Sequence, residues 1–176
     1  MSDASEDQIE EMKNLLYQGY NKGDIFFKIS PIALAEKKKY SFESLKGRRN
    51  QGGEITIGKI LKDDDRFTSY LFFFTTGGKR VSGLMNVPKN GSNLPVMVLI
   101  RGYVDQTIYT TGEGTRRVGE EFASQGFLTL APDLLGYGSS DKPSSNAMEE
   151  RFQTYTTVLD LLESVKTVNE ALEKQN

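Results

Sequence analysis

The sequence predicts an α/β fold in which an antiparallel meander leads into a parallel strand–helix–strand–helix unit. Residues 54–87 hold three runs between turn residues, of which the first and third place apolar residues on one face and the second is aromatic and β-branched, as strands are. Residues 95–100 are apolar without alternation, which is typical of a parallel strand covered on both faces. Residues 147–174 carry apolar side chains three or four positions apart, the spacing of a helix.

The meander is expected to contain three strands. The first covers residues 54–61, and the second, residues 67–76, is rich in aromatic and β-branched side chains. Gly77 and Gly78 supply a hairpin turn, and residues 79–88 return the chain. Pro88 ends this strand because proline cannot donate to a sheet ladder.

The second half alternates strands and helices. A strand over residues 95–100 precedes a helix over residues 114–125, which Gly126 ends. A short strand over residues 127–133 then leads into a loop rich in Gly, Ser and Pro. The long final helix is expected to turn its apolar stripe toward the core, namely Met148, Phe152, Tyr155, Leu159, Leu162, Val165, Val168 and Leu172.

The chain is expected to have an N-terminal helical extension, residues 1–36, and one main domain, residues 37–176. In the extension, residues 6–18 have the apolar spacing of an amphipathic helix. The N-terminus is acidic and has no apolar run, and no window approaches the roughly 20 apolar residues of a membrane span. We therefore expect no membrane partner and a cytoplasmic protein.

Composition excludes several kinds of site. The net charge is -2 without a basic stripe, so nucleic-acid binding has little electrostatic support. The sequence contains no cysteine and no histidine, which removes thiolate chemistry, the commonest general base and the commonest metal ligand. We expect neither a metal nor a cofactor.

One stretch carries a family resemblance: "PVMVLIRGYVDQTIYTTGEGTRRVGEEFASQGFLTLAPDLLGYGSSDKP", residues 95–143. It resembles the N-terminal half of an α/β-hydrolase, most closely serine hydrolases of the prolyl-oligopeptidase and dienelactone-hydrolase type. In those proteins a strand ends in His-Gly-Tyr or His-Gly-Gly, and a helix and an "aPD.rG.G.S" strand-loop follow. The similarity runs from about Tyr40 to the C-terminus. It implies an incomplete α/β-hydrolase fold and hydrolysis of an ester or peptide bond through an acyl-enzyme.

The resemblance also implies site residues. The Tyr103 N–H would be one of two donors to the oxyanion of the tetrahedral intermediate, and Gly102 would let the backbone come close. Arg101 stands where many relatives have His. It could donate to loop carbonyls, bind a substrate carboxylate, or pair with Asp133 or Asp105. The substrate rim would comprise Arg101, Asp133 and Tyr137, with Asp133 ordering its loop rather than doing chemistry.

The catalytic residues themselves are missing from this chain. No Gly-x-Ser-x-Gly elbow occurs, and the nearest pentapeptide, residues 122–126, closes a helix. Without histidine, a Ser-His-Asp triad cannot form from these residues alone. The chain would thus be an N-terminal fragment of a serine hydrolase, one chain of a split enzyme, or a non-catalytic binding module derived from the fold.

The partner expectation follows from the family's topology. It places the strand at residues 96–100 between the one at residues 127–131 and a further strand that is not encoded here. The uncovered apolar edge should then pair with the missing C-terminal half or with another copy of the chain. An ester or peptide would be the substrate of the complete enzyme.

Overall fold

The computed structural model describes residues 39–49 and 51–175, which fall into two units that divide between Arg48 and Arg49. In the first unit the described part holds α3 (Phe42–Lys46). The Ser41 hydroxyl caps this helix by accepting a hydrogen bond from the Ser44 N–H. The predicted extension, residues 1–36 with its helix at 6–18, lies outside the described residues.

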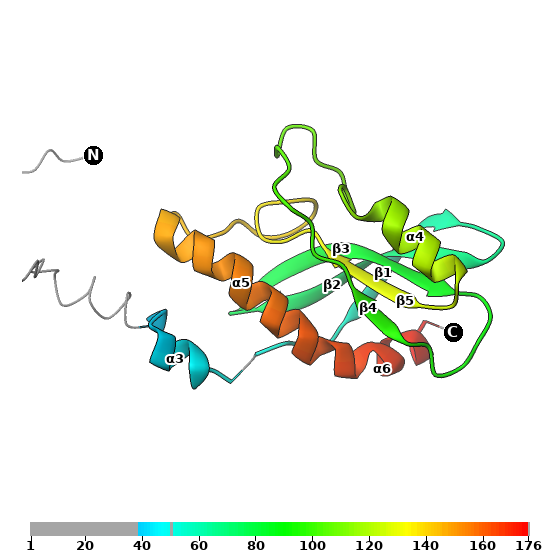
Figure 1. The fold of residues 1–176 in the computed structure, drawn as a ribbon, viewed down its shortest axis with the longest axis horizontal. Coiled ribbons are helices and arrows are strands. Elements are labelled where there is room, and N and C mark those ends of the chain that lie inside the picture. The colour runs from blue at the N-terminus through cyan, green and yellow to red at the C-terminus, as the bar shows by residue number, and fades with distance from the viewer. Residues whose placement is uncertain (1–38, 50, 176) are drawn as a thin grey trace, which may run out of the picture. The chain divides into compact units, whose positions relative to one another are not determined.

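The second unit is built on a five-stranded sheet with the order β1-β2-β3-β5-β4 (Figure 1). The strands are β1 (Thr56–Asp63), β2 (Phe67–Thr76), β3 (Lys79–Pro88), β4 (Val96–Val98) and β5 (Leu128–Pro132). Neighbours from β1 through β3 to β5 pair antiparallel, whereas β4 pairs parallel with β5. The predicted fold class, an antiparallel meander leading into a parallel strand–helix–strand unit, is confirmed.

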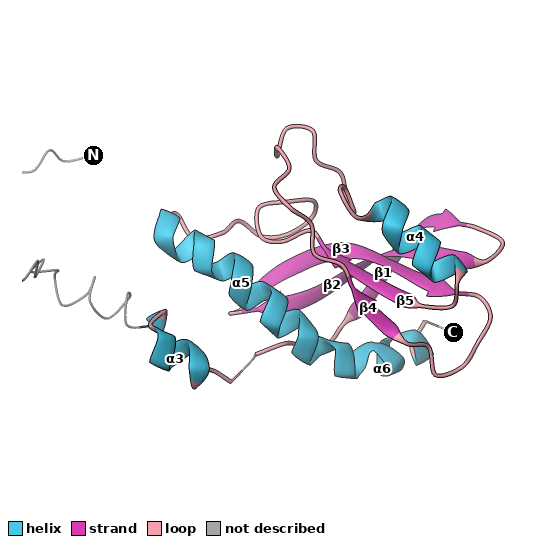
Figure 2. Ribbon diagram, viewed as in Figure 1, coloured by secondary structure: helices cyan, strands magenta, loops and turns pink. Residues whose placement is uncertain are grey.

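Helices cover both faces of the sheet (Figure 2). They are α4 (Arg116–Ser124), α5 (Ala147–Ser164), the 3-10 turn η1 (Val165–Thr167) and α6 (Val168–Glu173). A Cβ on Gly119 of α4 would lie 3.3 Å from Thr129 of β5, whereas Leu161 of α5 shares a buried cluster with Leu128 and Leu130. Because successive strand residues point to opposite faces, α4 and α5 lie on opposite sides.

The main core lies between the sheet and the α5–α6 side. Phe72, Met85, Leu130 and Leu161 are completely buried there, and Val168 of α6 joins them. Burial of a side chain of this size contributes about 1.5–3 kcal/mol. This cluster therefore holds α5 and α6 against the sheet.

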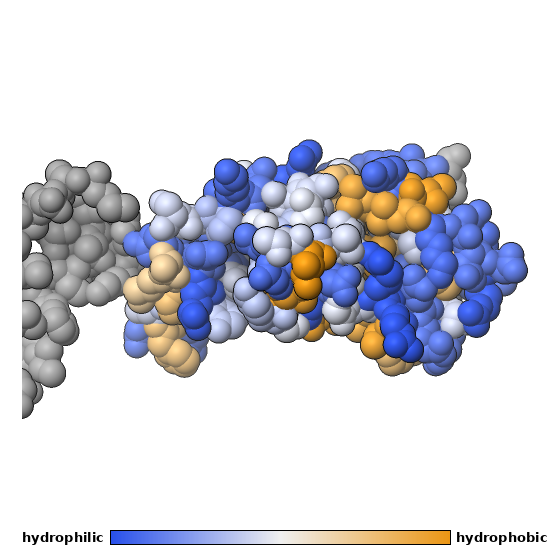
Figure 3. Space-filling view, turned by 90° about the horizontal axis from the view of Figure 1, so that it is seen from above, coloured by the Kyte–Doolittle hydropathy of each residue, from blue (hydrophilic) through white to orange (hydrophobic). Residues whose placement is uncertain are grey.

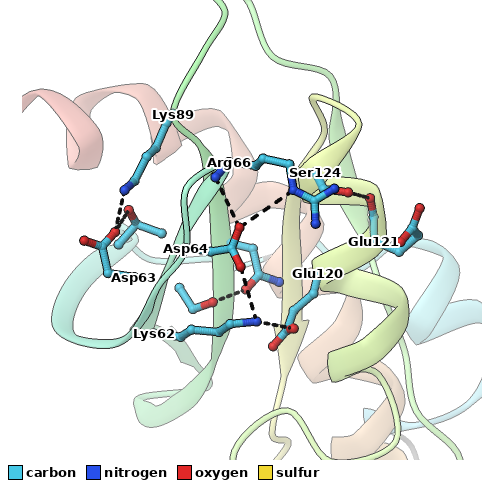
Figure 4. A network of polar contacts seen from close by, with 11 residues as sticks. Lys62, Asp63, Asp64, Arg66, Lys89, Glu120, Glu121 and Ser124 are labelled. Carbon is cyan, nitrogen blue, oxygen red and sulfur yellow. Dashed lines mark hydrogen bonds and ion pairs between the residues drawn. The ribbon is translucent and has the colours of Figure 1, made fainter.

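On the face of the sheet that α4 covers, polar contacts connect this helix to the meander (Figure 4). The Lys62 ammonium lies 2.6 Å from Glu120 of α4 and 3.8 Å from Asp64, and Arg66 lies 3.8 Å from the same Asp64. Exposed ion pairs of this kind contribute about 0–1 kcal/mol each. The close approach of α4 at Gly119 is thus the more important contact.

The predicted single helix over residues 147–174 is wrong in one respect, because the chain passes through η1 between α5 and α6. The Ser164 hydroxyl donates to the Asp160 carbonyl, and the Thr167 hydroxyl donates to the Ser164 carbonyl. Thr167 also accepts the Ile55 N–H at 2.9 Å. Side-chain hydroxyls that donate to main-chain carbonyls bend helices. Here the Thr167 hydroxyl also binds the residue just before β1.

The predicted orientation of α5 is also wrong for much of its stripe. Met148, Tyr155, Leu159 and Leu162 are 46%, 60%, 40% and 49% exposed, respectively. The buried face instead carries Leu161 together with four small or polar residues, namely Thr156, Thr157, Asp160 and Ser164.

The physical reason is a close backbone contact. A Cβ on Gly52 would lie 2.1 Å from the Asp160 carbonyl oxygen, so the segment before β1 touches the helix backbone. The Asp160 carboxylate accepts hydrogen bonds of 2.7 Å from the Gln51 N–H and the Thr76 hydroxyl. Beside Gly52 the helix has room only for small or polar side chains, and much of the apolar stripe of α5 turns outward.

Strand β4 is the last strand of the sheet in the described part of the chain. The Leu128 N–H donates to the Pro95 carbonyl and the Leu99 N–H to the Leu130 carbonyl. Backbone groups alternate along a strand, so those of Val96, Val98 and Ile100 point away from β5. Val96 and Ile100 are also 38% and 47% exposed. The predicted pairing of β4 with residues 127–131 is confirmed. The other edge of β4 pairs with no strand in the described part of the chain.

None of the helices in the described residues is both long enough and apolar enough to cross a membrane. Figure 3 looks from above onto the side of the loop that follows β4, where separate hydrophobic patches interrupt a mainly hydrophilic surface. The exposed apolar residues of the β4–α4 loop and of α4 include Ile108 and Val118.

Candidate functional site

An open cavity of about 500 Å³ lies where β4 and β5 end. The loop after β4, the loop after β5 and the first turns of α5 form its walls. Ligands of open α/β sheets gather at the carboxyl ends of parallel strands, which is where this cavity lies. Its lining includes Arg101, Gly102, Tyr103, Tyr137, Arg151 and Tyr155.

Asp133 lies beneath this cavity rather than in its wall, because it is completely buried. Its Oδ1 accepts hydrogen bonds from the Tyr109 hydroxyl at 2.7 Å and the Gly112 N–H at 3.2 Å. Its Oδ2 accepts from the Ser82 hydroxyl at 2.5 Å and the Thr111 hydroxyl at 3.0 Å. The carboxylate thus joins β3, the loop before α4 and the end of β5.

The loop after β5 folds directly over the same carboxylate. Gly138 has a φ of +57°, and a Cβ there would lie 2.2 Å from the Asp133 Oδ2. Only glycine meets both conditions, since it tolerates left-handed backbone and lacks the atom that would collide. The Ser82 hydroxyl also accepts the Ser139 N–H at 2.9 Å, which fixes the loop from the other side.

Arg101 packs against two aromatic rings. Its guanidinium carbon lies 4.0 Å from the Tyr137 ring centre and 4.7 Å from that of Tyr109. The two rings meet edge to face at 4.9 Å. Its Nη1 donates to the Gly102 carbonyl and its Nη2 to the Asp133 carbonyl, each at 2.9 Å. Of the roles considered for Arg101, the structure therefore contains the contact with main-chain carbonyls.

Tyr109 has an altered acidity in this environment. Burial raises the pKa of its phenol, and the neighbouring Asp133 carboxylate raises it further. The Arg101 cation opposes this rise in the Tyr109 pKa without cancelling it. The phenol therefore stays protonated and keeps donating to Asp133 throughout the neutral range.

Tyr103 stands at the mouth of the cavity. Its side chain is 87% exposed, and its N–H donates to no acceptor among the residues that the structure describes. A Cβ on Gly102 would meet nothing within 4 Å, so folding of the described residues does not require glycine there. An unpartnered N–H and an open approach therefore coincide at this point.

The structure brings four of the five predicted site residues into the cavity wall: Arg101, Gly102, Tyr103 and Tyr137. Tyr109 and Ser82, which hold the site together, were not predicted. They lie 24 and 51 residues from Asp133 in sequence, and no local pattern marks either of them. In the described part of the chain no group of three or more His, Cys, Asp or Glu side chains is arranged to hold a metal ion.

Comparison with known proteins gives structural neighbours only. No family model matches the chain, and no curated protein matches it. Acetyl xylan esterase 1 from Thermoanaerobacterium sp. JW/SL YS485 is similar over 66% of this chain and 40% of its own, with 16% identity and a TM-score of 0.49.

Other neighbours include crystal structures of the rice cell wall degrading esterase LipA from Xanthomonas oryzae. A mutant of LipA is similar over 72% of this chain and 39% of its own, with 15% identity and a TM-score of 0.43. LipA itself is similar over 68% of this chain and 40% of its own, with 14% identity and a TM-score of 0.37. The chain thus spans about two fifths of the length of the solved structures it matches.

Proposed function

We propose that this chain is the oxyanion-binding part of a serine hydrolase that cleaves a carboxylic ester or a peptide bond. The observation that carries the proposal is the unpartnered Tyr103 N–H at an open cavity, directly after the edge strand β4. The resemblance of residues 95–143 to serine hydrolases, including the prolyl-oligopeptidase and dienelactone-hydrolase type, supports the same reading.

The chemistry requires a donor of this kind. When a serine oxygen attacks the carbonyl carbon, the C=O π electrons move onto the carbonyl oxygen, which becomes an anion. A fixed N–H that reaches this oxygen lowers the barrier, and losing one such donor typically costs about 3 kcal/mol. Tyr103 would supply one donor, and the residue after the nucleophile would supply the other.

In this proposal a second polypeptide segment supplies the nucleophile, since these 176 residues contain neither histidine nor a Gly-x-Ser-x-Gly elbow. The free edge of β4 is suited to a further strand, since Val96, Val98 and Ile100 direct their backbone groups outward. The exposed stripe of α5 offers an apolar surface for a further helix. In this proposal the nucleophile segment binds β4 and brings its serine next to Tyr103.

A labelling experiment tests the proposal. The purified chain is treated with a fluorophosphonate probe and with p-nitrophenyl acetate, alone and after mixing with the C-terminal half of an α/β-hydrolase that carries the serine elbow. The chain alone should be neither labelled nor active, and the mixture should be labelled on the added half and hydrolyse the ester. Val96→Lys is the matched control, because it blocks the β4 edge without touching the cavity.

Two results would count against the proposal: labelling of a serine in this chain alone, and a mixture that binds tightly yet is neither labelled nor active. The second result would favour the other candidate function, a non-catalytic interaction module. The exposed α5 stripe is the observation that favours that alternative, because several exposed apolar side chains on one helix are typical of an interaction site.

A further inference from the structure

We propose that Arg101 is a positioning residue that orients the peptide unit between Gly102 and Tyr103, so that its N–H faces the cavity. The inference rests on the proposed function for its catalytic meaning, but its geometry is independent of that function. The guanidinium Nη1 donates to the carbonyl oxygen of this peptide unit at 2.9 Å.

The planarity of the peptide determines where the N–H points. No cis peptide bond occurs in the described residues, and in a trans peptide the C=O and N–H of one unit point in opposite directions. The Gly102 carbonyl is directed at Arg101, so the Tyr103 N–H is directed away from Arg101. That N–H has no acceptor among the described residues, and Tyr103 lines the cavity.

Arg101 is itself held on several sides. Its Nη2 donates to the Asp133 carbonyl, and the rings of Tyr109 and Tyr137 lie against the guanidinium. Tyr109 is fixed in turn by its hydrogen bond to the buried Asp133. Arg101 therefore ties the loop that follows β4 to Asp133, both directly and through Tyr109.

A second contact fixes the other side of Tyr103. The Tyr137 hydroxyl donates to the Val104 carbonyl at 3.0 Å. The carbonyls before and after Tyr103 are thus both bound by side chains of one aromatic–arginine cluster, formed by Arg101, Tyr109 and Tyr137. This restraint matters because Gly102 is sterically free and would otherwise sample many backbone conformations.

The cation has an electronic effect as well. A charged donor on a carbonyl withdraws electron density through the amide and makes the N–H of the same unit a stronger donor. Lysine cannot replace Arg101 in this role. A single ammonium cannot pack flat against two rings while it donates to two carbonyls in a fixed plane.

Nuclear magnetic resonance on the chain as it exists tests this geometry without any substrate. The residual dipolar coupling of the Tyr103 N–H gives its direction in the wild-type protein. The Gly102 carbonyl ¹³C shift and the Tyr103 amide ¹⁵N shift report the hydrogen bond from Arg101. The variants are Arg101→Lys and Arg101→Met. Arg117→Met on the exposed side of α4 is the matched control, and thermal melts show that each variant is folded.

We expect the wild-type coupling to fit an N–H that points into the cavity. Both Arg101 variants should move the Gly102 and Tyr103 signals toward random-coil values, and Arg117→Met should leave them in place. In the complemented hydrolase, Arg101→Lys should lower kcat by up to about 100-fold with KM unchanged, because a donor used in the transition state is lost.

A wild-type coupling that directs the N–H into the protein overturns the positioning role, and so does an unchanged Gly102 carbonyl shift in both variants. Neither result depends on labelling of the complementing half. Failure of that labelling counts against the hydrolase proposal alone, so the two can fail separately.

Discussion

The Tyr109 hydroxyl donates a 2.7 Å hydrogen bond to the Oδ1 of Asp133, 24 residues further along the chain. This contact joins the loop that follows β4 to the end of β5. It also places the Tyr109 ring against the Arg101 guanidinium. One phenol thus serves both the fold and the candidate site.

Replacing Tyr109 with Phe should lower the free energy of unfolding by about 1.5–3 kcal/mol, because a buried carboxylate loses a donor. Urea denaturation followed by circular dichroism measures the loss. Tyr155→Phe removes a hydroxyl from a side chain that is 60% exposed and should change stability little. Equal losses in the two variants would contradict the role given to the Tyr109 hydrogen bond.

The raised pKa of Tyr109 predicts a pH dependence. The unfolded phenol has an ordinary pKa near 10.0, whereas the folded one holds its proton to higher pH. The resulting stabilisation is complete below pH 10.0 and is lost as the pH rises through the folded pKa. Above pH 10 the wild type should lose stability faster than Tyr109→Phe, by up to about 1.4 kcal/mol per pH unit. Parallel stability curves for the two proteins would argue against a raised pKa.

The exposed edge and stripe predict self-association of the isolated chain at high concentration. Val96→Lys should reduce it, because a charge on an edge strand opposes strand pairing. Leu159→Ser on α5 should reduce it independently. Multi-angle light scattering measures the association, and Val118→Lys on α4 is a control at a 50% exposed apolar site. A wild type that stays monomeric at every concentration would contradict this prediction.

Substitution by alanine should have very different effects on stability at Gly138 and at Gly102. Gly138→Ala should cost more than about 2 kcal/mol, since its φ is +57° and its Cβ would collide with Asp133. Gly102→Ala should change stability by less than about 1 kcal/mol, because nothing lies within 4 Å. Thermal denaturation of both variants makes the comparison. A large loss at Gly102 would show that folding, not ligand access, requires that glycine.

The strands of the sheet were largely predictable because their signals are local. Aromatic and β-branched composition marked β2, an alternating apolar face marked β3, and the Gly77–Gly78 turn set their ends. An unbroken apolar run marked β4. The outward orientation of α5 was not predictable in this way. It depends on Gly52, which lies 108 residues before Asp160 and whose contact with the helix appears only in three dimensions.

The candidate site likewise contains residues that the sequence predicted and contacts that it did not. Arg101, Gly102, Tyr103 and Tyr137 follow strand ends, and a sheet brings strand ends together. The interactions of Arg101 were left open by the sequence, because its choice between carbonyls, carboxylates and substrate depends on the rings that pack against it. Ser82 gave no signal at all, since a serine within a strand is ordinary.

The convergence of four donors on Asp133 limits how this region can change. Removing any one donor alters what the other three contribute, so single substitutions around the carboxylate will not combine additively. A redesign of the rim for another ligand cannot proceed one position at a time. Three segments depend on one another through Asp133, namely the turn of residues 109–112, the loop of residues 133–140 and Ser82 on β3. A loop taken from another protein would have to replace all three together.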